Sequence, residues 1–209
     1  MLAKTLESTE IESIKDVIIL VTQLGDEYVA IRLQVTKFIV AISPRLGKRG
    51  TEAANLVNQY MEYILAGFQN AELTLKDSAF AFGALCQDCA VVLAPCTQQY
   101  IEKILVPEFV GTWRYDDVSQ DIICGFGSLI NEVYVTNPTQ TQDLLTNTVR
   151  PILIPLRESI QMAVDKKAEE NLEAGQVPRI DGYLIDDISD SLQLIGDLFK
   201  TCNEFSQGD

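Results

Sequence analysis

Apolar residues recur along this chain at the three- and four-residue spacing that places side chains on one face of an α-helix. No stretch shows the sustained alternation of a β-strand, so the sequence predicts an all-α protein. Four apolar stripes show the helical spacing most clearly: Ile11, Ile14, Val17, Ile18 and Val21; Ala54, Val57, Met61, Ile64 and Phe68; Val118, Ile122, Phe126, Leu129 and Val133; Ile188, Leu192, Ile195 and Phe199.

Helix-breaking residues divide the chain into eight segments of helix length. Every second segment begins with an acidic residue near a small or β-branched apolar residue, and we expect these acids to be N-cap or first-turn carboxylates of the helices. The first intervals between them, about 40 to 50 residues, are typical of HEAT and armadillo repeats. The acids are Asp26, Asp77, Asp116 and Asp186; the breakers are Gly25, Pro44 with Gly47, Asn70, Pro95, Gly111, Asn137 with Pro138, and Gly182.

The sequence therefore predicts an α-solenoid of about four stacked HEAT-type hairpins within one segment, residues 1–209. An ordinary globular helical bundle is the alternative. The first helix of the last hairpin contains Pro151 and Pro155, which we expect to kink it or mark its first turn. The hairpins are expected at residues 9–46, 51–95, 97–135 and 140–205, with an inserted polar loop at 166–184.

The stretch "FGALCQDCAVVLAP" contains Cys86 and Cys89 in a Cys-x-x-Cys spacing. On a helix, Phe82, Cys86, Cys89 and Leu93 form one apolar stripe, and cysteine is readily buried. A structural zinc site needs four ligands, and a thioredoxin-type redox pair follows a strand, which is not predicted here. We interpret the two cysteines as core residues, with a redox pair or a metal site as the alternatives.

Composition excludes several kinds of chemistry. The chain has 209 residues, five cysteines and no histidine, which removes His-based acid–base catalysis, Ser-His and Cys-His nucleophiles, and zinc sites that use histidine. Neither a phosphate-binding glycine loop nor a nucleophile with an evident base is present. We therefore expect no enzyme activity, no cofactor and no metal.

The charge of the chain bears on its partners. Its net charge of −14 repels nucleic-acid phosphates and attracts basic partners, although the same acidity also keeps a protein soluble. No apolar run has the roughly 18 to 20 residues of a membrane-spanning helix, so neither nucleic acid nor membrane is an expected direct partner. The odd cysteine count and the lack of a visible secretory signal favour a reducing compartment.

Residues 29–104 resemble HEAT repeats of the β-karyopherins, the importin-β-like nuclear transport receptors, and most resemble the transportin-SR-like branch. The resemblance rests on the helix "KDSAFAFGALCQDC", the short turn "VLAP" and the fresh helix "TQQYIEKI". From Val106 onward only the general hairpin pattern is similar. Such receptors have many more than four repeats, so the chain is expected to be an internal segment. The matching positions are Ala79, Ala84, Leu85, Cys86, Asp88, Cys89, Leu93 and Pro95.

The resemblance implies a non-catalytic carrier that shuttles between cytoplasm and nucleus. It would bind protein cargo on the concave side of the solenoid, respond to Ran-GTP through other parts of the parent chain, and accept phenylalanine-glycine nucleoporins between outer helices. A static HEAT scaffold or regulatory subunit is the alternative.

In such stacks the second helices line the inner surface. With the stripe at Ile188, Leu192, Ile195 and Phe199 facing the core, the acids of the last helix would face outward and bind a basic cargo segment. The alternative is a solvated helix face whose acids only suit the helix dipole. The candidate cargo-binding residues are Asp117, Asp121, Asp186, Asp187, Asp190 and Asp197.

Overall fold

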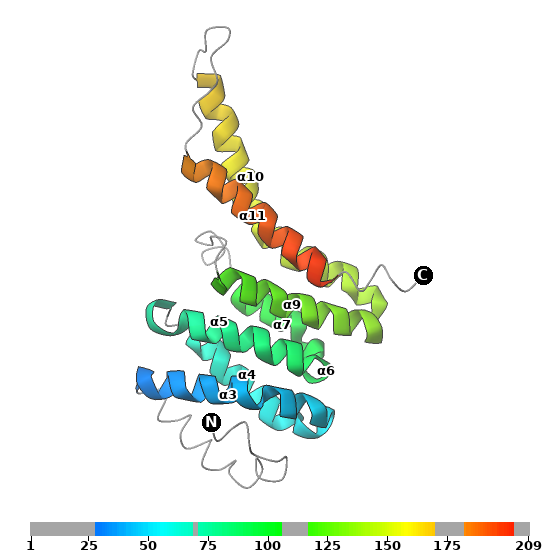
Figure 1. The fold of residues 1–209 in the computed structure, drawn as a ribbon. Coiled ribbons are helices and arrows are strands. Elements are labelled where there is room, and N and C mark those ends of the chain that lie inside the picture. The colour runs from blue at the N-terminus through cyan, green and yellow to red at the C-terminus, as the bar shows by residue number, and fades with distance from the viewer. Residues whose placement is uncertain (1–27, 69–70, 106–116, 170–181, 203–209) are drawn as a thin grey trace.

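The computed structural model describes residues 28–68, 71–105, 117–169 and 182–202, and in this part of the chain every regular element is a helix (Figure 1). The all-α prediction is thus confirmed. The first apolar stripe, at 11–21, lies outside the described residues. The helices are α3 (Val29–Arg49), η2 (Gly50–Ala53), α4 (Ala54–Gly67), α5 (Ala71–Asp88), α6 (Ala90–Leu93), η3 (Ala94–Cys96), α7 (Thr97–Ile104), α9 (Asp117–Thr136), α10 (Pro138–Glu169) and α11 (Gly182–Thr201).

The helices form two layers of a helical-repeat solenoid. In one layer α5 packs between α3 and α9, and α9 packs between α5 and α11. The other layer contains α4, the α6–η3–α7 segment and α10, so each helix of the first layer after α3 is paired with the helix that precedes it in the chain. The α10–α11 pair forms one end of the stack and extends beyond the other helices (Figure 1). Each pair buries its apolar face against the next, as repeat proteins do.

The core lies between the two layers and is centred on Phe82 of α5, which is fully buried. Its ring meets Phe68 and Tyr100 edge-on, at centroid distances of 6.3 and 6.4 Å, and lies 5.2 Å from the ring of Phe126 on α9. The second and third predicted stripes are confirmed: their members are buried or partly buried in this core. Phe82 therefore joins two successive helix pairs, α4–α5 and α7–α9.

The prediction that Pro44 and Gly47 interrupt the first helix is wrong, because α3 runs through both residues to Arg49. Proline has no N–H for the carbonyl of Val40, four residues earlier. The hydroxyl of Ser43 lies 3.0 Å from that carbonyl oxygen and 2.5 Å from a carboxylate oxygen of Asp88. A hydroxyl has a single proton, and the closer, charged acceptor is the Asp88 carboxylate, so Ser43 does not replace the missing N–H; α3 nevertheless continues through Pro44. Pro151 and Pro155 likewise lie inside a helix, α10.

Two expectations about acids at helix starts are also wrong. Helix α5 begins at Ala71 and α11 at Gly182, so Asp77 and Asp186 lie in the second turn or beyond and cannot cap these helices. Asp26 and Asp116 lie outside the described residues. Asp77 and Asp186 therefore lie within helices of one layer and do not mark where these helices begin.

The fourth apolar stripe does not face the core as predicted. Leu192 and Phe199 are 56% and 51% exposed, whereas Leu194 and Leu198 are buried. Helix α11 has apolar residues on two faces, and the one packed against α9 and α10 is the face that contains Leu194, Leu198 and, just after the helix, Cys202. Ile188 and Ile195 lie at the border and are partly buried.

Candidate functional site

The acids predicted to bind cargo lie on α9 and α11, two neighbouring helices of one layer. On α11, Asp186, Asp190 and Asp197 follow one another at four and seven residues and share a face, with Asp186 exposed and the other two half-buried. Asp187 is also half-buried but points about 100° away from Asp186. Asp117 is the first residue of α9, and its side chain lies outside the described residues.

Asp121 of α9 and Asp197 of α11 both lie close enough to the thiol of Cys124 to act on it electrostatically. Burial raises the pKa of the Cys124 thiol, and the two carboxylates raise it further. The hydrogen bond that the Thr201 hydroxyl donates to the Cys124 sulfur, at 3.9 Å, and the ammonium of Lys200 lower the pKa of this thiol. The structure thus brings together two predicted acids that are 76 positions apart in the sequence. We call Asp121, Asp186, Asp190 and Asp197 the acidic surface.

Contacts at the end of α11 fix the position of this surface. The side-chain amide of Asn131 donates a 2.6 Å hydrogen bond to the carbonyl of Thr201, and the Cys202 thiol lies 3.9 Å from the carbonyl of Gly127. A Cβ added to Gly127 would lie only 2.5 Å from the Thr201 side chain, so α9 and α11 approach closely because this residue is glycine. The small residue and the amide set the register of α11 on α9.

Cys86 and Cys89 lie in the core, as predicted, with 0% and 2% of their surfaces exposed. Helix α5 ends at Asp88, and the chain turns by 96° around Cys89 into α6. Burial raises the pKa of both thiols, and it raises that of Cys89 to about 12. Electrostatic repulsion adds a smaller increase, from Cys89 to the pKa of Cys86 and from Asp88 to the pKa of Cys89. The thiol of Cys89 lies 3.7 Å from the carbonyl of Ser43. Buried, protonated thiols of this kind are poor nucleophiles.

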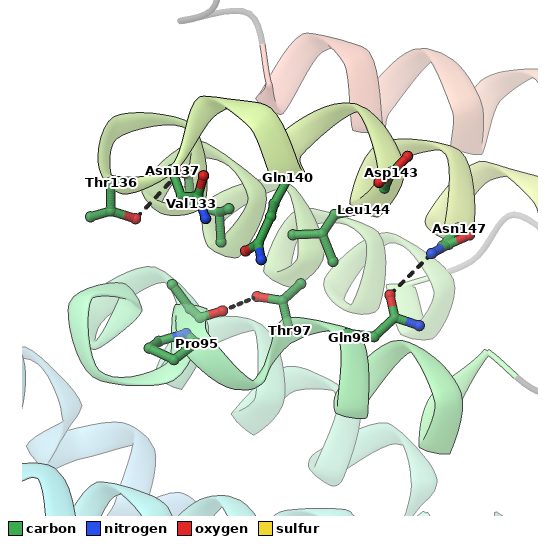
Figure 2. A pocket seen from close by; sticks show the side chains of 11 residues that line it. Pro95, Thr97, Gln98, Val133, Thr136, Asn137, Gln140, Asp143, Leu144 and Asn147 are labelled. Carbon is green, nitrogen blue, oxygen red and sulfur yellow. Dashed lines mark hydrogen bonds between the residues drawn. The ribbon is translucent and has the colours of Figure 1, made fainter.

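A groove that sequence reasoning missed lies between the η3–α7 segment and the corner where α9 meets α10 (Figure 2). Its volume is about 510 Å³. At one edge the side-chain amide of Asn147 donates a 3.1 Å hydrogen bond to the side-chain oxygen Oε1 of Gln98. Figure 2 shows Gln140 extending from α10 toward Thr97. The Thr97 hydroxyl donates a 2.7 Å hydrogen bond to the carbonyl oxygen of Ala94. The nearest signal in the sequence is the cluster of amide side chains around residue 140.

The groove has a polar rim over an apolar floor. Carboxamides offer both a donor and an acceptor, which suits the main chain of an extended peptide, and the carboxylate of Asp143 adds one negative charge. Pro95, Val133 and Leu144 supply the apolar lining. The groove can therefore hold a short peptide segment, but it contains no group suited to covalent chemistry.

No protein-family model, curated protein or solved structure matches the chain. In the described residues, no cluster of three or more metal-ligating side chains is present. No single described helix is long and apolar enough to cross a membrane; only the pair Thr74–Asp88 and Ala90–Ile104, bent by 96°, reaches that length and hydropathy together.

Proposed function

We propose that this chain is a segment of a nuclear transport receptor of the β-karyopherin type, and that it binds a basic segment of a protein cargo without catalysing a reaction. Three features support the proposal: the stacked helical pairs, the acidic surface on adjacent helices of one layer, and the resemblance of residues 29–104 to HEAT repeats of that family. Ran-GTP would act through other parts of the parent receptor, and nucleoporins with phenylalanine-glycine repeats would be further partners.

The observation that carries the proposal is that Asp121 of α9 and Asp197 of α11 both lie near Cys124, so that adjacent helices bring two carboxylates to one part of the surface. An arginine or lysine that reaches this place meets two carboxylates from different helices, and charge-assisted hydrogen bonds to carboxylates are stronger than neutral ones. Asp186 and Asp190 extend the negative charge along α11 for further basic residues of the same segment. The net charge of −14 steers such a segment toward the chain.

Calorimetric titration with an arginine-rich peptide tests this. The double variant Asp121→Asn, Asp197→Asn removes two charges and keeps the side-chain volumes, and we expect it to bind about ten-fold or more weakly, since an exposed ion pair contributes up to about 1 kcal/mol. Asp143→Asn is the matched control, because Asp143 lies in the groove of the other layer. If both variants bind the peptide as wild type does, the acidic surface is not the binding site.

A static scaffold is the second candidate, and the apolar side chains exposed on α10 and α11 favour it, because permanent interfaces are more apolar than transient ones. The two candidates differ in their response to Ran-GTP. A receptor segment, tested in its parent chain, changes its affinity for basic cargo when Ran-GTP is added. A scaffold binds its partner with the same affinity whether or not Ran-GTP is present. Pull-downs with and without Ran-GTP make the comparison.

A further inference from the structure

The layer formed by α3, α5, α9 and α11 carries opposite charges toward its two ends (Figure 1). Helix α3 contains five basic residues and no acidic one, whereas α9 contains three acidic residues and no basic one. Helix α11 adds four acidic residues and a single lysine. A ligand that lies across the layer therefore meets positive charge over α3 and negative charge over α9 and α11.

Two lysines of α3 point away from the core, on the outer face of the layer. Residues two positions apart on a helix point in nearly opposite directions, about 200° apart. Lys37 lies two positions before Ile39, and Lys48 lies two positions after Leu46. Ile39 and Leu46 are fully buried, and both lysines are exposed. The two ammonium groups are thus accessible to a ligand on the outer face.

Phe80 of α5 lies between these lysines and the carboxylates of α9. Its ring is 53% exposed, and it points away from the core because it lies two positions before the fully buried Phe82. Asp121 has the same relation to the fully buried Ile123. A Cβ added to Gly83 would lie 2.8 Å from the carbonyl oxygen of Asp121, so α5 and α9 approach closely about one turn beyond Phe80. The exposed ring and this carboxylate therefore lie on the same face of adjacent helices.

We propose that the segment bound by this layer is bipolar, with a basic end, a central apolar residue and an acidic end. The basic end lies over Asp121 and Asp197, and the acidic end lies over Lys37 and Lys48, because each end then meets the opposite charge. The apolar residue packs on the ring of Phe80, since exposed aromatic rings are frequent anchors of interfaces. Because the basic end is the one that the proposed function assigns to the acidic surface, the bipolar segment presupposes that function.

The spacing of the helices sets the length of the segment. Packed helices lie about 8–10 Å apart, so the three steps from α3 to α11 span about 25–30 Å. An extended chain advances about 3.3 Å per residue, and about eight or nine residues cross the layer. A wholly basic segment of this length would bring its far end against Lys37 and Lys48, where like charges repel.

Calorimetric titration of the full 209-residue chain with four peptides of about nine residues tests the proposal. Two block peptides have arginines at one end, apolar residues in the middle and glutamates at the other end, in the two possible orders. A third peptide has the same composition with the charges interleaved, and a fourth replaces the glutamates by glutamine in the block order that binds more tightly. We expect one block peptide to bind at least about ten-fold more tightly than the interleaved peptide, because only the blocks match both ends of the layer.

Single variants identify the two new parts of the surface. Lys37→Glu weakens the block peptide by about five-fold or more, because an attraction becomes a repulsion, and it leaves the glutamine peptide unchanged. Lys103→Glu is the matched control, since Lys103 is equally exposed but lies on α7 in the other layer, and its variant binds both peptides as wild type does. Phe80→Ala weakens both peptides by about five-fold or more. Helix content from circular dichroism confirms that the variants are folded.

The outcomes separate this inference from the proposed function. If the glutamine peptide binds and the block peptide binds no more tightly, the acidic end is wrong and the proposed function stands. Equal binding of the block and interleaved peptides, or no effect of Lys37→Glu on the block peptide, likewise overturns the bipolar segment alone. An unchanged affinity of Phe80→Ala overturns the apolar anchor. If no peptide binds, the glutamine peptide included, the proposed function fails and the bipolar segment fails with it.

Discussion

Gly47 of α3 packs directly on the end of α5, so replacing it by alanine tests how the stack is held together. A Cβ at this position would lie 2.0 Å from the carbonyl oxygen of Asp88 and 2.9 Å from its carbonyl carbon. Both are backbone atoms and cannot rotate away. The same contact includes the hydrogen bond between the Ser43 hydroxyl and the Asp88 carboxylate, so α3 is tied to α5 on this side.

The magnitude follows from the distance that must be opened. Ordinary van der Waals contact begins near 3.4 Å, so the helices must separate locally by about 1.4 Å. A gap of this size removes half or more of the dispersion energy of the atoms that face it, and overpacking typically costs about 1–3 kcal/mol. Alanine regains about 0.5–1 kcal/mol of helix propensity. We expect Gly47→Ala to lower the free energy of unfolding by about 2 kcal/mol, or the melting temperature by about 4–8 °C.

Urea denaturation followed by circular dichroism at 222 nm measures this change, and Gly196→Ala is the control. No atom lies within 4 Å of a Cβ added to Gly196, which is exposed inside α11, so the same substitution there gains about 0.5–1 kcal/mol. Equal stability of Gly47→Ala and Gly196→Ala would refute the close contact between α3 and α5.

Three further predictions concern the core. Phe82→Ala removes a fully buried ring that contacts three others and lowers the free energy of unfolding by about 3–5 kcal/mol, measured by the same denaturation; a loss below 1 kcal/mol would contradict its central position. Ser43→Ala removes the hydroxyl that donates to the Asp88 carboxylate between α3 and α5 and costs about 1–2 kcal/mol, whereas a neutral result would show that this hydrogen bond does not stabilise the contact between the two helices. The raised pKa of Cys89, about 12 against 9, leaves about a thousand-fold less thiolate at pH 8 in the folded chain, so Ellman's reagent modifies Cys89 only after unfolding. Stability accordingly declines as pH rises from about 9 toward 12, because the unfolded thiol loses its proton first.

The all-α class and most core residues could be predicted from the sequence, because the residues that a helix buries against its neighbours recur every three or four positions. The stripe from Ile122 to Val133 is an example, since α9 is packed on two sides. Periodicity could not choose between the two apolar faces of α11. The faces of Leu192 and of Leu194 both repeat at the helical period, and only the positions of α9 and α10 decide which is buried.

Local chemistry accounts for the remaining differences. A proline normally ends a helix, and no spacing in the sequence indicates that α3 continues through Pro44 and that the Ser43 hydroxyl binds the Asp88 carboxylate, 45 positions away. The groove depends on a contact between Gln98 and Asn147, which are 49 positions apart, so no local pattern indicates it. The sequence indicated Asp121 and Asp197 separately, and the packing of α9 on α11 places both near Cys124.

The salt dependence of peptide binding tests the central claim most directly, namely that this layer of stacked helices binds a basic segment through its carboxylates. The affinity of the wild-type chain for an arginine-rich peptide is measured by calorimetry from about 50 to about 300 mM salt, over which the screening length falls to less than half. We expect the affinity to fall by about ten-fold, and an acidic peptide of equal length not to bind. Binding that is absent, or equally tight at both salt concentrations, would contradict the claim.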